Sequence, residues 1–414
     1  MSDERPVGPA AHAPTASFSI DRVDAARRLL RGVIRATPSV RSDSLSRKLS
    51  RDVWLKPEFR QRTGSFKIRG AYTMQSALGP GAAVVAGSAG NQAQGVALAA
   101  SLLGQRATIF MPVNASLPKV QATRSYGAEV ILGSDTVDDC LDSARSFAAE
   151  HGATFVPPFD HPDIVVGQAT IGLELIDEVP DLGSVLVAIG GGGLCAGVAT
   201  AVKVRRPDVR IIGVVAEGAA SMVESLAAGE PRAVEPRTIA DGIALKAPAQ
   251  LTFELIRDHV DEVVAVSDEA ISRAMLLLVE RAKAVVEPAG AAPLAALLDG
   301  SLRAMGGATA VILGGGNVDP LLLSKLIEHG LSAAGRYLVF RAVMTDRPGS
   351  LASLSETLAE MGLNVLDVEH HRTGVRLPFS QVEMQVTVET RDHDHRASVL
   401  AELTGRGFHV DLVE

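Results

Sequence analysis

A single lysine, Lys67, lies between two apolar residues in the stretch "RTGSFKIRGA" (62–71). A lysine on a surface helix is ordinarily a solvated charge. It becomes a nucleophile when burial or a cationic neighbour lowers its pKa and frees the amine. Phe66 and Ile68 flank Lys67, and Arg69 follows two places on. Lys67 is therefore a candidate amine nucleophile, and the rest of the chain must supply its site.

Four consecutive glycines, Gly190, Gly191, Gly192 and Gly193, separate an apolar run from an Ala-rich stretch that starts at Leu194. Such a loop lets successive backbone N–H groups converge on an anion, and the start of the following helix adds favourable potential. A tight turn alone needs only one or two glycines. The loop lacks both GxGxxG and GK[ST], so it is neither a dinucleotide fingerprint nor a Walker A loop. The pattern predicts a phosphate-binding loop.

Three further loops contain small or polar residues that could contact a ligand. "GSAGNQAQG" (87–95) would let a ligand approach the backbone and offers the amide of Asn91, and the helix behind it would attract a carboxylate. "VVEPAGAA" (285–292) places Glu287 before a helix start, and "LGGGNVD" (313–319) is the third loop. Alone, each loop could equally be ordinary turn chemistry.

Together these features suit one cofactor. A candidate amine nucleophile, a phosphate loop and a carboxylate-sized anion site match a molecule that is both an aldehyde and a phosphate ester. Pyridoxal phosphate carries both groups. In this interpretation Lys67 holds the aldehyde carbon as a Schiff base, and residues 190–193 hold the phosphate.

The elements that must position these residues alternate between apolar runs and Ala-rich stretches from about residue 20 to residue 327. We predict buried strands at 82–88, 106–112, 128–133, 185–190, 210–216 and 309–316. Strands that alternate with helices predict a doubly wound α/β sheet covered on both faces. Ligands bind at the carboxyl ends of the strands in such folds, and the Gly-rich loops fall there.

The pattern changes after "SAAG" (332–335), which predicts a short linker. A strand at 337–343, a helix at 348–362 and an alternating strand at 382–389 follow. The stretch 358–369 is echoed in 403–414, each with a helix end, a glycine and a strand. This predicts βαββαβ, the ferredoxin-like plan.

Composition excludes several classes of protein. The chain has 414 residues and a formal net charge of -8 without a basic run, which argues against nucleic acid and anionic membranes as partners. No apolar stretch is long enough to span a membrane. The two cysteines are too few for a disulfide scaffold. We expect a cytoplasmic protein whose first residues, 1–18, form a disordered tail.

The motifs occur together and in order in one known family. The chain resembles the threonine/serine dehydratases of the fold-type II pyridoxal-phosphate family. The matching stretches, between about residues 20 and 325, are "KPEFRQRTGSFKIRGA", "SAGNQAQG", "PPFDHPDIVVGQATIGLE", "GGGGL", "ADGIALKAPAQLTFELI", "VVEPAGA" and "GGGNVD". The stretch "DRPGSLASLSETLAEMGLNVLDVEH" resembles an ACT domain, a small amino-acid-sensing module.

The resemblance implies an α/β fold class like that of the tryptophan synthase beta chain, with two doubly wound subdomains. The catalytic domain would span 19–328, with a smaller subdomain inserted at about 65–155. A ferredoxin-like ACT regulatory domain would span 336–414.

The resemblance also implies roles for residues. Lys67 would hold pyridoxal phosphate and, once released, take the α-proton of the substrate. Phe66 would pack near the pyridine ring, and Asn91 would hydrogen-bond its 3-hydroxyl group. The full cofactor site would comprise Phe66, Lys67, Asn91, Gly190, Gly191, Gly192, Gly193, Leu194, Glu287 and Gly314. The substrate site would comprise Ser88, Ala89, Gly90, Asn91 and Gln92.

Glu217 matches one carboxylate of a metal site found in some relatives, but Val223 replaces the second, so no metal is predicted.

The implied activity is that of a threonine dehydratase, or ammonia-lyase. It would convert L-threonine to 2-oxobutanoate and ammonia in isoleucine biosynthesis, and L-serine to pyruvate as a secondary reaction. An amino-acid effector would act through the ACT domain of a homo-oligomer, either dimer or tetramer.

Three departures from the family pattern keep alternatives open. Gln92 stands where the family has His, Gly314 where it has a Ser that meets the pyridine nitrogen, and Ala169 where it has Gly. These changes leave room for another β-hydroxy or β-substituted substrate, or for a catalytically weak amino-acid sensor. A racemase is a further alternative, but Ala89 replaces the Ser of the racemase branch, which favours a lyase.

Overall fold

The computed structural model describes residues 18–300, 302, 306–372 and 380–413. Residues 1–17 of the predicted tail (1–18) lie outside these ranges. By its internal contacts the chain divides into two compact units, Met1–Pro320 and Leu321–Glu414.

The larger sheet of the first unit has the order β1-β2-β10-β7-β8-β9. All neighbouring strands are parallel except the first pair. Its strands are β1 (Val40–Arg41), β2 (Val53–Lys56), β10 (Ala308–Ile312), β7 (Leu182–Ala188), β8 (Arg210–Ala216) and β9 (Glu262–Val266). The helices of this part are α1 (Ile20–Leu30), α2 (Asp43–Leu49), α7 (Pro162–Glu178), α8 (Gly193–Arg205), α9 (Ser221–Ala228), α10 (Gln250–His259), α11 (Asp268–Leu277) and α12 (Pro288–Asp299). Short turns of helix are η2 (Glu58–Arg60), η3 (Glu217–Ala219), η4 (Asp241–Ile243) and η5 (Leu278–Ala282).

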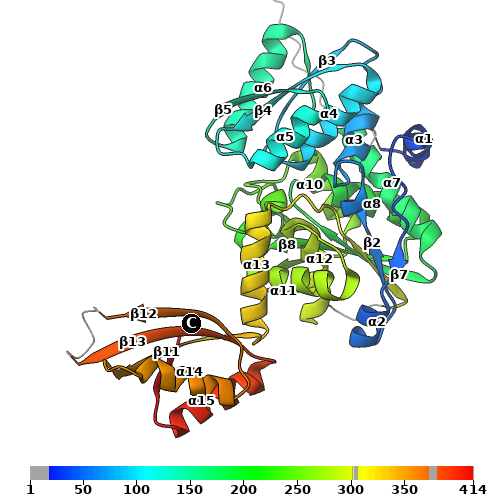
Figure 1. Cartoon of the computed structure of the whole chain (residues 1–414). Helices are drawn as coiled ribbons and strands as arrows, with labels where there is room; N and C mark the ends of the chain where they lie inside the picture. The colour runs from blue at the N-terminus through cyan, green and yellow to red at the C-terminus, as the bar shows by residue number, and fades with distance from the viewer. Residues whose placement is uncertain (1–17, 301, 303–305, 373–379, 414) are drawn as a thin grey trace, which may run out of the picture. The chain divides into compact units, whose positions relative to one another are not determined.

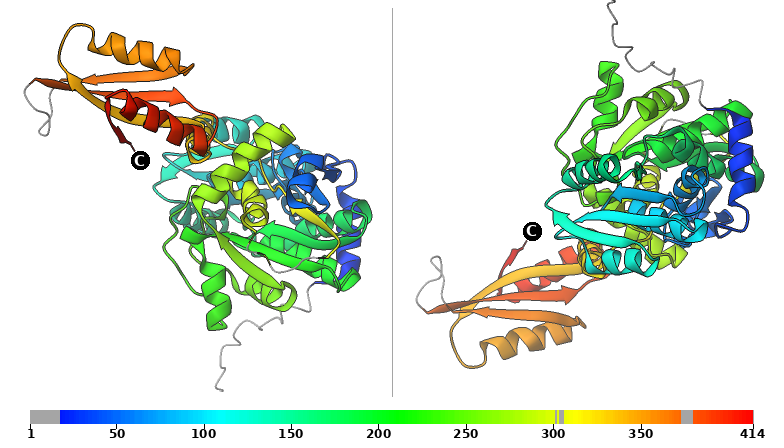
Figure 2. Two further views of the ribbon diagram at one scale, coloured as in Figure 1. Left: turned by 90° about the horizontal axis from the view of Figure 1, so that it is seen from below. Right: turned by 90° about the horizontal axis from the view of Figure 1, so that it is seen from above.

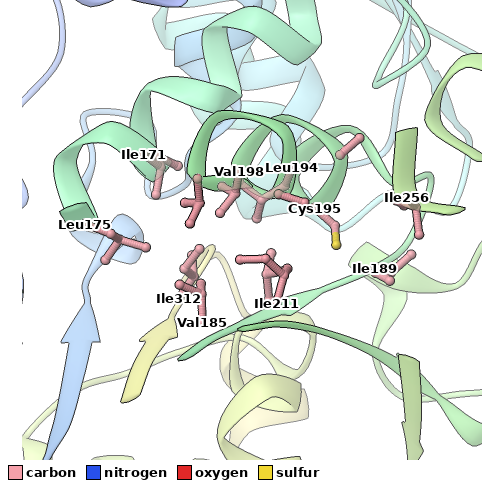
Figure 3. Close-up of a cluster of buried hydrophobic side chains, with 14 of the residues drawn as sticks. Ile171, Leu175, Val185, Ile189, Leu194, Cys195, Val198, Ile211, Ile256 and Ile312 are labelled. Atoms are coloured by element: carbon pink, nitrogen blue, oxygen red, sulfur yellow. The ribbon is translucent and has the colours of Figure 1, made fainter. Parts of the chain in front are cut away.

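Helices α7 and α8 pack on this sheet and bury an apolar core. In Figure 3, Ile171 and Leu175 of α7 and Val198 of α8 face Val185 of β7 and Ile211 of β8. Burying a side chain of this size contributes about 1.5–3 kcal/mol. The core therefore fixes the strand ends that carry the Gly-rich loops.

The smaller sheet of the same unit has the order β5-β4-β3-β6, and all its strands are parallel. Its elements are α3 (Lys67–Gln75), β3 (Ala83–Gly87), α4 (Asn91–Leu103), β4 (Arg106–Pro112), α5 (Leu117–Ser125), β5 (Glu129–Ser134), α6 (Val137–His151) and β6 (Thr154–Phe155). Figures 1 and 2 show these strands in cyan with their helices around them. Two α/β sheets in the first unit agree with the predicted fold class.

Local sequence explains how these helices begin and end. Helix α6 begins at a capping box between Thr136 and Asp139, and it ends at Gly152, whose φ of 63° is left-handed. After its polar first turn, helix α4 contains mainly small and apolar residues, and most of the helix is buried. Its Gly95 lies so close to α3 that a β-carbon there would be 3.1 Å from the carbonyl carbon of Lys67. Small residues thus allow α4 to pack directly against the helix that carries the lysine.

The second unit contains the predicted βαββαβ module. Its elements are α13 (Pro320–Ala333), β11 (Tyr337–Thr345), α14 (Ser350–Glu360), β12 (Val365–His371), β13 (Gln381–Glu389), α15 (His393–Gly405) and β14 (His409–Leu412). The sheet order is β12-β13-β11-β14, with antiparallel neighbours throughout. The linker predicted at 332–335 was partly wrong, because α13 continues through Ala333. The overlooked helical signal is the spacing of three leucines. Leu322 and Leu323 precede Leu326 by four and three positions, which is the spacing of one helix face.

Candidate active site

Lys67 is the first residue of α3, and Phe66 precedes it as the N-cap. Its Nζ donates a hydrogen bond to the backbone oxygen of Pro158 at 2.7 Å and lies 5.4 Å from the centroid of the Phe66 ring. Burial lowers the pKa of Lys67 to about 8, although the negative charge of Glu287 opposes this shift. A lysine with this pKa is partly neutral near pH 7.5, which makes its amine available as a nucleophile.

Arg69 does not supply the cationic neighbour that the sequence suggested, because burial and not Arg69 lowers the pKa of Lys67. The Arg69 guanidinium instead forms bidentate pairs with Glu58, at 2.8 and 2.9 Å, and with Glu174, at 2.6 and 2.9 Å. Its side chain is completely buried. Of the two conditions proposed for a reactive lysine, desolvation is thus the one that applies.

The four-glycine loop connects β7 to α8 and has no space for side chains. A β-carbon on Gly191 would lie 2.1 Å from the Phe159 ring, and on either outer glycine it would lie within 3.0 Å of a neighbouring residue. Gly192 is the N-cap of α8 and has a φ of 90°, in the left-handed region that favours glycine. Glycine is therefore required throughout the loop, as expected for a cradle in which backbone N–H groups at a helix start contact an anion.

Asn91, Glu287 and Asn317 form a hydrogen-bonded cluster that joins three of the predicted loops. The Asn91 amide nitrogen donates to Glu287 Oε1 at 2.7 Å, and the Asn317 amide nitrogen donates to Asn91 Oδ1 at 2.7 Å and to the Thr63 carbonyl. Gly315 makes this approach possible, because a β-carbon there would be 2.1 Å from Glu287 Oε1. The Asn91 amide is thereby fixed in orientation, and its nitrogen carries a second hydrogen that can meet a ligand.

Glu287 is only 5% exposed. Burial raises the pKa of Glu287 to about 7, and the nearby Asp241 raises it as well, while Lys119 and the Asn91 hydrogen bond oppose the shift. A titratable group with such a pKa, close to a lysine whose pKa is lowered, is typical of an active site.

The loop predicted to bind the substrate follows β3 and leads into α4. The Gly90 nitrogen donates to Ser88 Oγ at 3.1 Å, and Asn91 starts the helix. Gln92 is buried, with 3% exposure, and its amide nitrogen donates to the Pro157 carbonyl at 2.9 Å. Within the described part of the chain its Oε1 accepts no hydrogen bond. A buried acceptor of this kind is suited to a donor on a ligand.

The structure shows the surroundings of Gly314 and Ala169, two residues that differ from the family pattern. A β-carbon on Gly314 would lie 3.4 Å from Phe66 Cδ1 and 3.7 Å from Leu194 Cδ2, which is ordinary contact, so glycine is not sterically required there. The Phe66 nitrogen donates to the Gly314 carbonyl at 3.1 Å, which places this loop against the lysine. Ala169 is buried in an apolar cluster that includes Val166 and Ala201, so its methyl group packs between helices.

Sequence reasoning missed three residues at this site: Asn317, Lys119 and Asp241. Lys119 and Asp241 form an ion pair at 2.8 Å, and Lys119 Nζ lies 3.8 Å from the position of a β-carbon on Gly90. Asn317 lies in a quoted motif and could have been noticed as an amide after three glycines. Asp241 also lies in a quoted stretch, "ADGIALKAPAQLTFELI", but Lys119 is 122 residues away, so only the fold shows that the two form a pair.

Two negative findings concern the described ranges. They contain no group of three or more His, Cys, Asp or Glu side chains placed to hold a metal ion. Nor does any helix within them have the length and apolar character needed to cross a membrane.

Comparison with known proteins identifies two families. Residues 30–315 match the family described as pyridoxal-phosphate dependent enzyme, and residues 339–407 match the ACT domain. The chain is 45% identical to the L-threonine ammonia-lyase of Geobacter sulfurreducens, over 93% of this chain and 97% of that one. It is 42% identical to the L-threonine ammonia-lyase of Thermotoga maritima, over 96% and 100%.

Solved structures agree with these matches. A threonine deaminase from T.th. superposes with a TM-score of 0.70 and 40% identity, covering 73% of this chain and 99% of that one. Maize serine racemase superposes with a TM-score of 0.70 and 33% identity, covering 77% and 99%. The predicted resemblance to pyridoxal-phosphate dependent dehydratases with an ACT domain is therefore confirmed.

Proposed function

We propose that this chain, which belongs to the pyridoxal-phosphate dependent enzyme family, is an L-threonine ammonia-lyase. It would convert L-threonine to 2-oxobutanoate and ammonia, and L-serine to pyruvate as a secondary reaction. The similarity to two L-threonine ammonia-lyases over almost the whole chain supports this activity. The observation that carries it is the desolvated amine of Lys67, whose pKa is near 8, beside the four-glycine cradle and the Asn91–Glu287 pair.

The residues present fit pyridoxal phosphate. Lys67 would hold its aldehyde carbon, and residues 190–194 would bind its phosphate through backbone N–H groups. Phe66 and Gly314 would contact the ring, and the free hydrogen of the Asn91 amide would meet the 3-hydroxyl group. When bound, the cofactor withdraws electrons from the substrate and so acidifies its α-carbon.

The side chains of this chain then have separate tasks. Lys67, once its amine is released, takes the α-proton of the substrate, and a pKa near 8 suits a general base at neutral pH. The loop from Ser88 to Gln92 orients the substrate carboxylate at the start of α4. Glu287 keeps Asn91 in place through the 2.7 Å hydrogen bond, so its task is to position another residue.

Ala89 and Gly314 favour elimination over racemisation. Racemisation needs a second acid on the face opposite Lys67, and Ala89 has no hydroxyl group to provide it. Gly314 has no hydroxyl group that could meet the pyridine nitrogen of the bound cofactor, and the ring would then be a weaker electron acceptor. Loss of a β-hydroxyl group tolerates this better than a reaction that depends on a long-lived carbanion.

The finer assignments extend to regulation and assembly. We propose that the ACT domain binds an amino-acid effector near "DRPGS" (346–350) and residues 362–364, and that the protein works as a cytoplasmic homo-oligomer in isoleucine biosynthesis. The match to the ACT family supports the regulatory part. We also propose that the catalytic domain spans 19–328, with its smaller subdomain at about 65–155, and that the ACT domain spans 336–414.

One assay tests the activity directly. Purified protein loaded with pyridoxal phosphate is incubated with L-threonine, and 2-oxobutanoate, ammonia and D-threonine are measured together. We expect 2-oxobutanoate and ammonia in equal amounts, with L-serine reacting more slowly. Formation of D-threonine at a comparable rate would instead identify a racemase, and a loaded protein that turns over neither substrate would point to the sensor or to a different β-substituted amino acid.

A further inference from the structure

Lys119 brings a positive charge to the loop that is expected to receive the substrate carboxylate. It lies in α5, and its Nζ is 3.8 Å from the position of a β-carbon on Gly90. The neighbouring Asn91 is the first residue of α4, a helix of 13 residues. The helix start and the ammonium group therefore both favour an anion at the same place.

The ion pair of Lys119 is unequal in burial. The Lys119 side chain is only 16% exposed, whereas its partner Asp241, 2.8 Å away, is 60% exposed. A largely buried ammonium group needs an anionic partner, because an uncompensated buried charge is costly. An exposed carboxylate keeps much of its hydration, so Asp241 can be released into solvent at small cost.

Gln92, in the first turn of α4, carries a polar atom that lacks a partner within the described ranges. Gln92 Oε1 is buried and accepts no hydrogen bond from the residues that the structure describes. An amino acid can serve both side chains, since its carboxylate can take the place of Asp241 beside Lys119 and its N–H or O–H groups can donate to Gln92.

We propose that Lys119 binds the α-carboxylate of the amino-acid substrate, and that this carboxylate replaces Asp241 as its partner when the substrate enters. The inference rests on the proposed function, because it assumes that an amino acid occupies this site. It adds a specificity-determining residue: Lys119 selects substrates with a free α-carboxylate.

A simpler role must be distinguished from this one. The ion pair joins α5, beside the small sheet, to η4, beside the large sheet, so it could act only as a clamp between the two. Lys246 and Asp138 provide a matched control, since they form a similar pair at 2.9 Å between the same two parts of the unit. Both of their side chains are more than half exposed.

The test measures binding of two ligands to the holoenzyme by isothermal titration calorimetry. L-2-Aminobutanoate resembles threonine without its hydroxyl group, and L-2-aminobutanamide is the same molecule without the carboxylate charge. Lys119→Gln should weaken binding of L-2-aminobutanoate about tenfold, as expected for loss of a charge-assisted hydrogen bond, and change binding of the amide by less than about twofold. Lys119→Arg should retain most of the affinity, and Lys246→Gln should leave both affinities unchanged.

Turnover provides a second measurement. Lys119→Gln should raise the KM for L-threonine by a similar factor and change kcat less. Equal loss of affinity for both ligands, or the same loss in Lys246→Gln, would overturn the inference and leave a clamp. A wild-type holoenzyme that binds neither ligand and produces no 2-oxobutanoate would refute the proposed function together with this inference, whereas normal turnover with an unselective Lys119→Gln variant would refute the inference alone.

Discussion

Lys67 and Arg69 are two cations on the same helix, two residues apart, and they have opposite environments. Arg69 is completely buried, and two carboxylates, Glu58 and Glu174, hold it through four short hydrogen bonds. Although burial alone would lower the pKa of Arg69, the two carboxylates raise it above its ordinary value. Lys67 has a backbone carbonyl as its hydrogen-bond partner, and burial lowers its pKa to about 8.

The ion pairs around Arg69 continue to residues of the larger sheet and its helices. Burial alone would raise the pKa of Glu174, but Arg69 and Lys56 lower it to about 2. Lys56 is itself completely buried and also pairs with Glu178 at 2.9 Å. These pairs join α3 to β2 and α7, so they fix the helix that begins with Lys67. Burial disfavours both cations, but the carboxylates around Arg69 more than offset this cost, whereas Lys67 lacks such pairing and its amine becomes reactive.

The largest expected effect comes from removing the reactive cation. Lys67→Met should lower turnover of L-threonine by at least about a thousandfold, because it removes both the amine that holds the cofactor and the base that takes the α-proton. Steady-state assays of 2-oxobutanoate formation measure this. Lys48→Met, which removes an exposed lysine, is the control and should leave turnover unchanged. Retention of a tenth or more of the activity in Lys67→Met would contradict the assignment.

Removing the partnered cation should instead affect stability. Arg69→Met leaves the buried carboxylates of Glu58 and Glu174 without their main partner, which should lower the free energy of unfolding by about 3–5 kcal/mol. Urea denaturation followed by the fluorescence of Trp54, the only tryptophan, reports on this part of the molecule. The double variant Arg69→Met/Glu58→Met should recover part of the loss. An Arg69→Met protein as stable as the wild type would show that the network does not anchor α3.

Removing Lys67 should have the opposite effect on stability in cofactor-free protein. Well below pH 8 the lysine is protonated in both the folded and the unfolded state, and the fold bears the cost of a desolvated charge. Between about 8 and the ordinary value of 10.5 the unfolded chain keeps the proton and the folded protein does not, so wild-type stability rises with pH. Lys67→Met should therefore be more stable than the wild type at pH 7, and this advantage should shrink towards pH 10. The same Trp54 measurement at both pH values would show a constant difference if burial did not lower the pKa.

The smallest effect is expected at Gly314, which stands where the family has Ser. Gly314→Ser should change the free energy of unfolding by less than about 1 kcal/mol, since its β-carbon has room at 3.4 Å from Phe66. The new hydroxyl group could reach the pyridine nitrogen and change kcat by up to about tenfold. Gly191→Ala is the contrasting variant, because its β-carbon would clash with Phe159 and should weaken binding of pyridoxal phosphate. Unfolding of Gly314→Ser would mean that the loop needs glycine after all.

The sequence was sufficient for features that local patterns encode. Two predicted strands, 106–112 and 210–216, match β4 and β8 residue for residue, because apolar runs between turn formers mark buried strands. The four-glycine loop was recognisable for the same reason, since four adjacent glycines are rarely needed for anything but backbone contacts. Lys67 could be proposed because its apolar neighbours are adjacent in the chain.

Pairings between distant residues could not be predicted. Arg69 was interpreted as a neighbour that acts on Lys67, because its partner Glu174 lies 105 positions away and only the fold brings them together. The Lys119–Asp241 pair was missed for the same reason. Glu287 was placed in the site from its motif, but its raised pKa depends on burial and on Asp241, and neither is visible in the sequence.

The identity of the lysine that holds the cofactor tests the central claim most directly. Borohydride reduction of the holoenzyme would attach the pyridoxyl group permanently to the amine that holds it, and mass spectrometry of the proteolysed protein would locate the added mass. We expect it on the peptide that contains Lys67 and on no other lysine. Modification of a different lysine, or none in a protein that carries the cofactor, would contradict the account of Lys67 as the desolvated and reactive member of the pair.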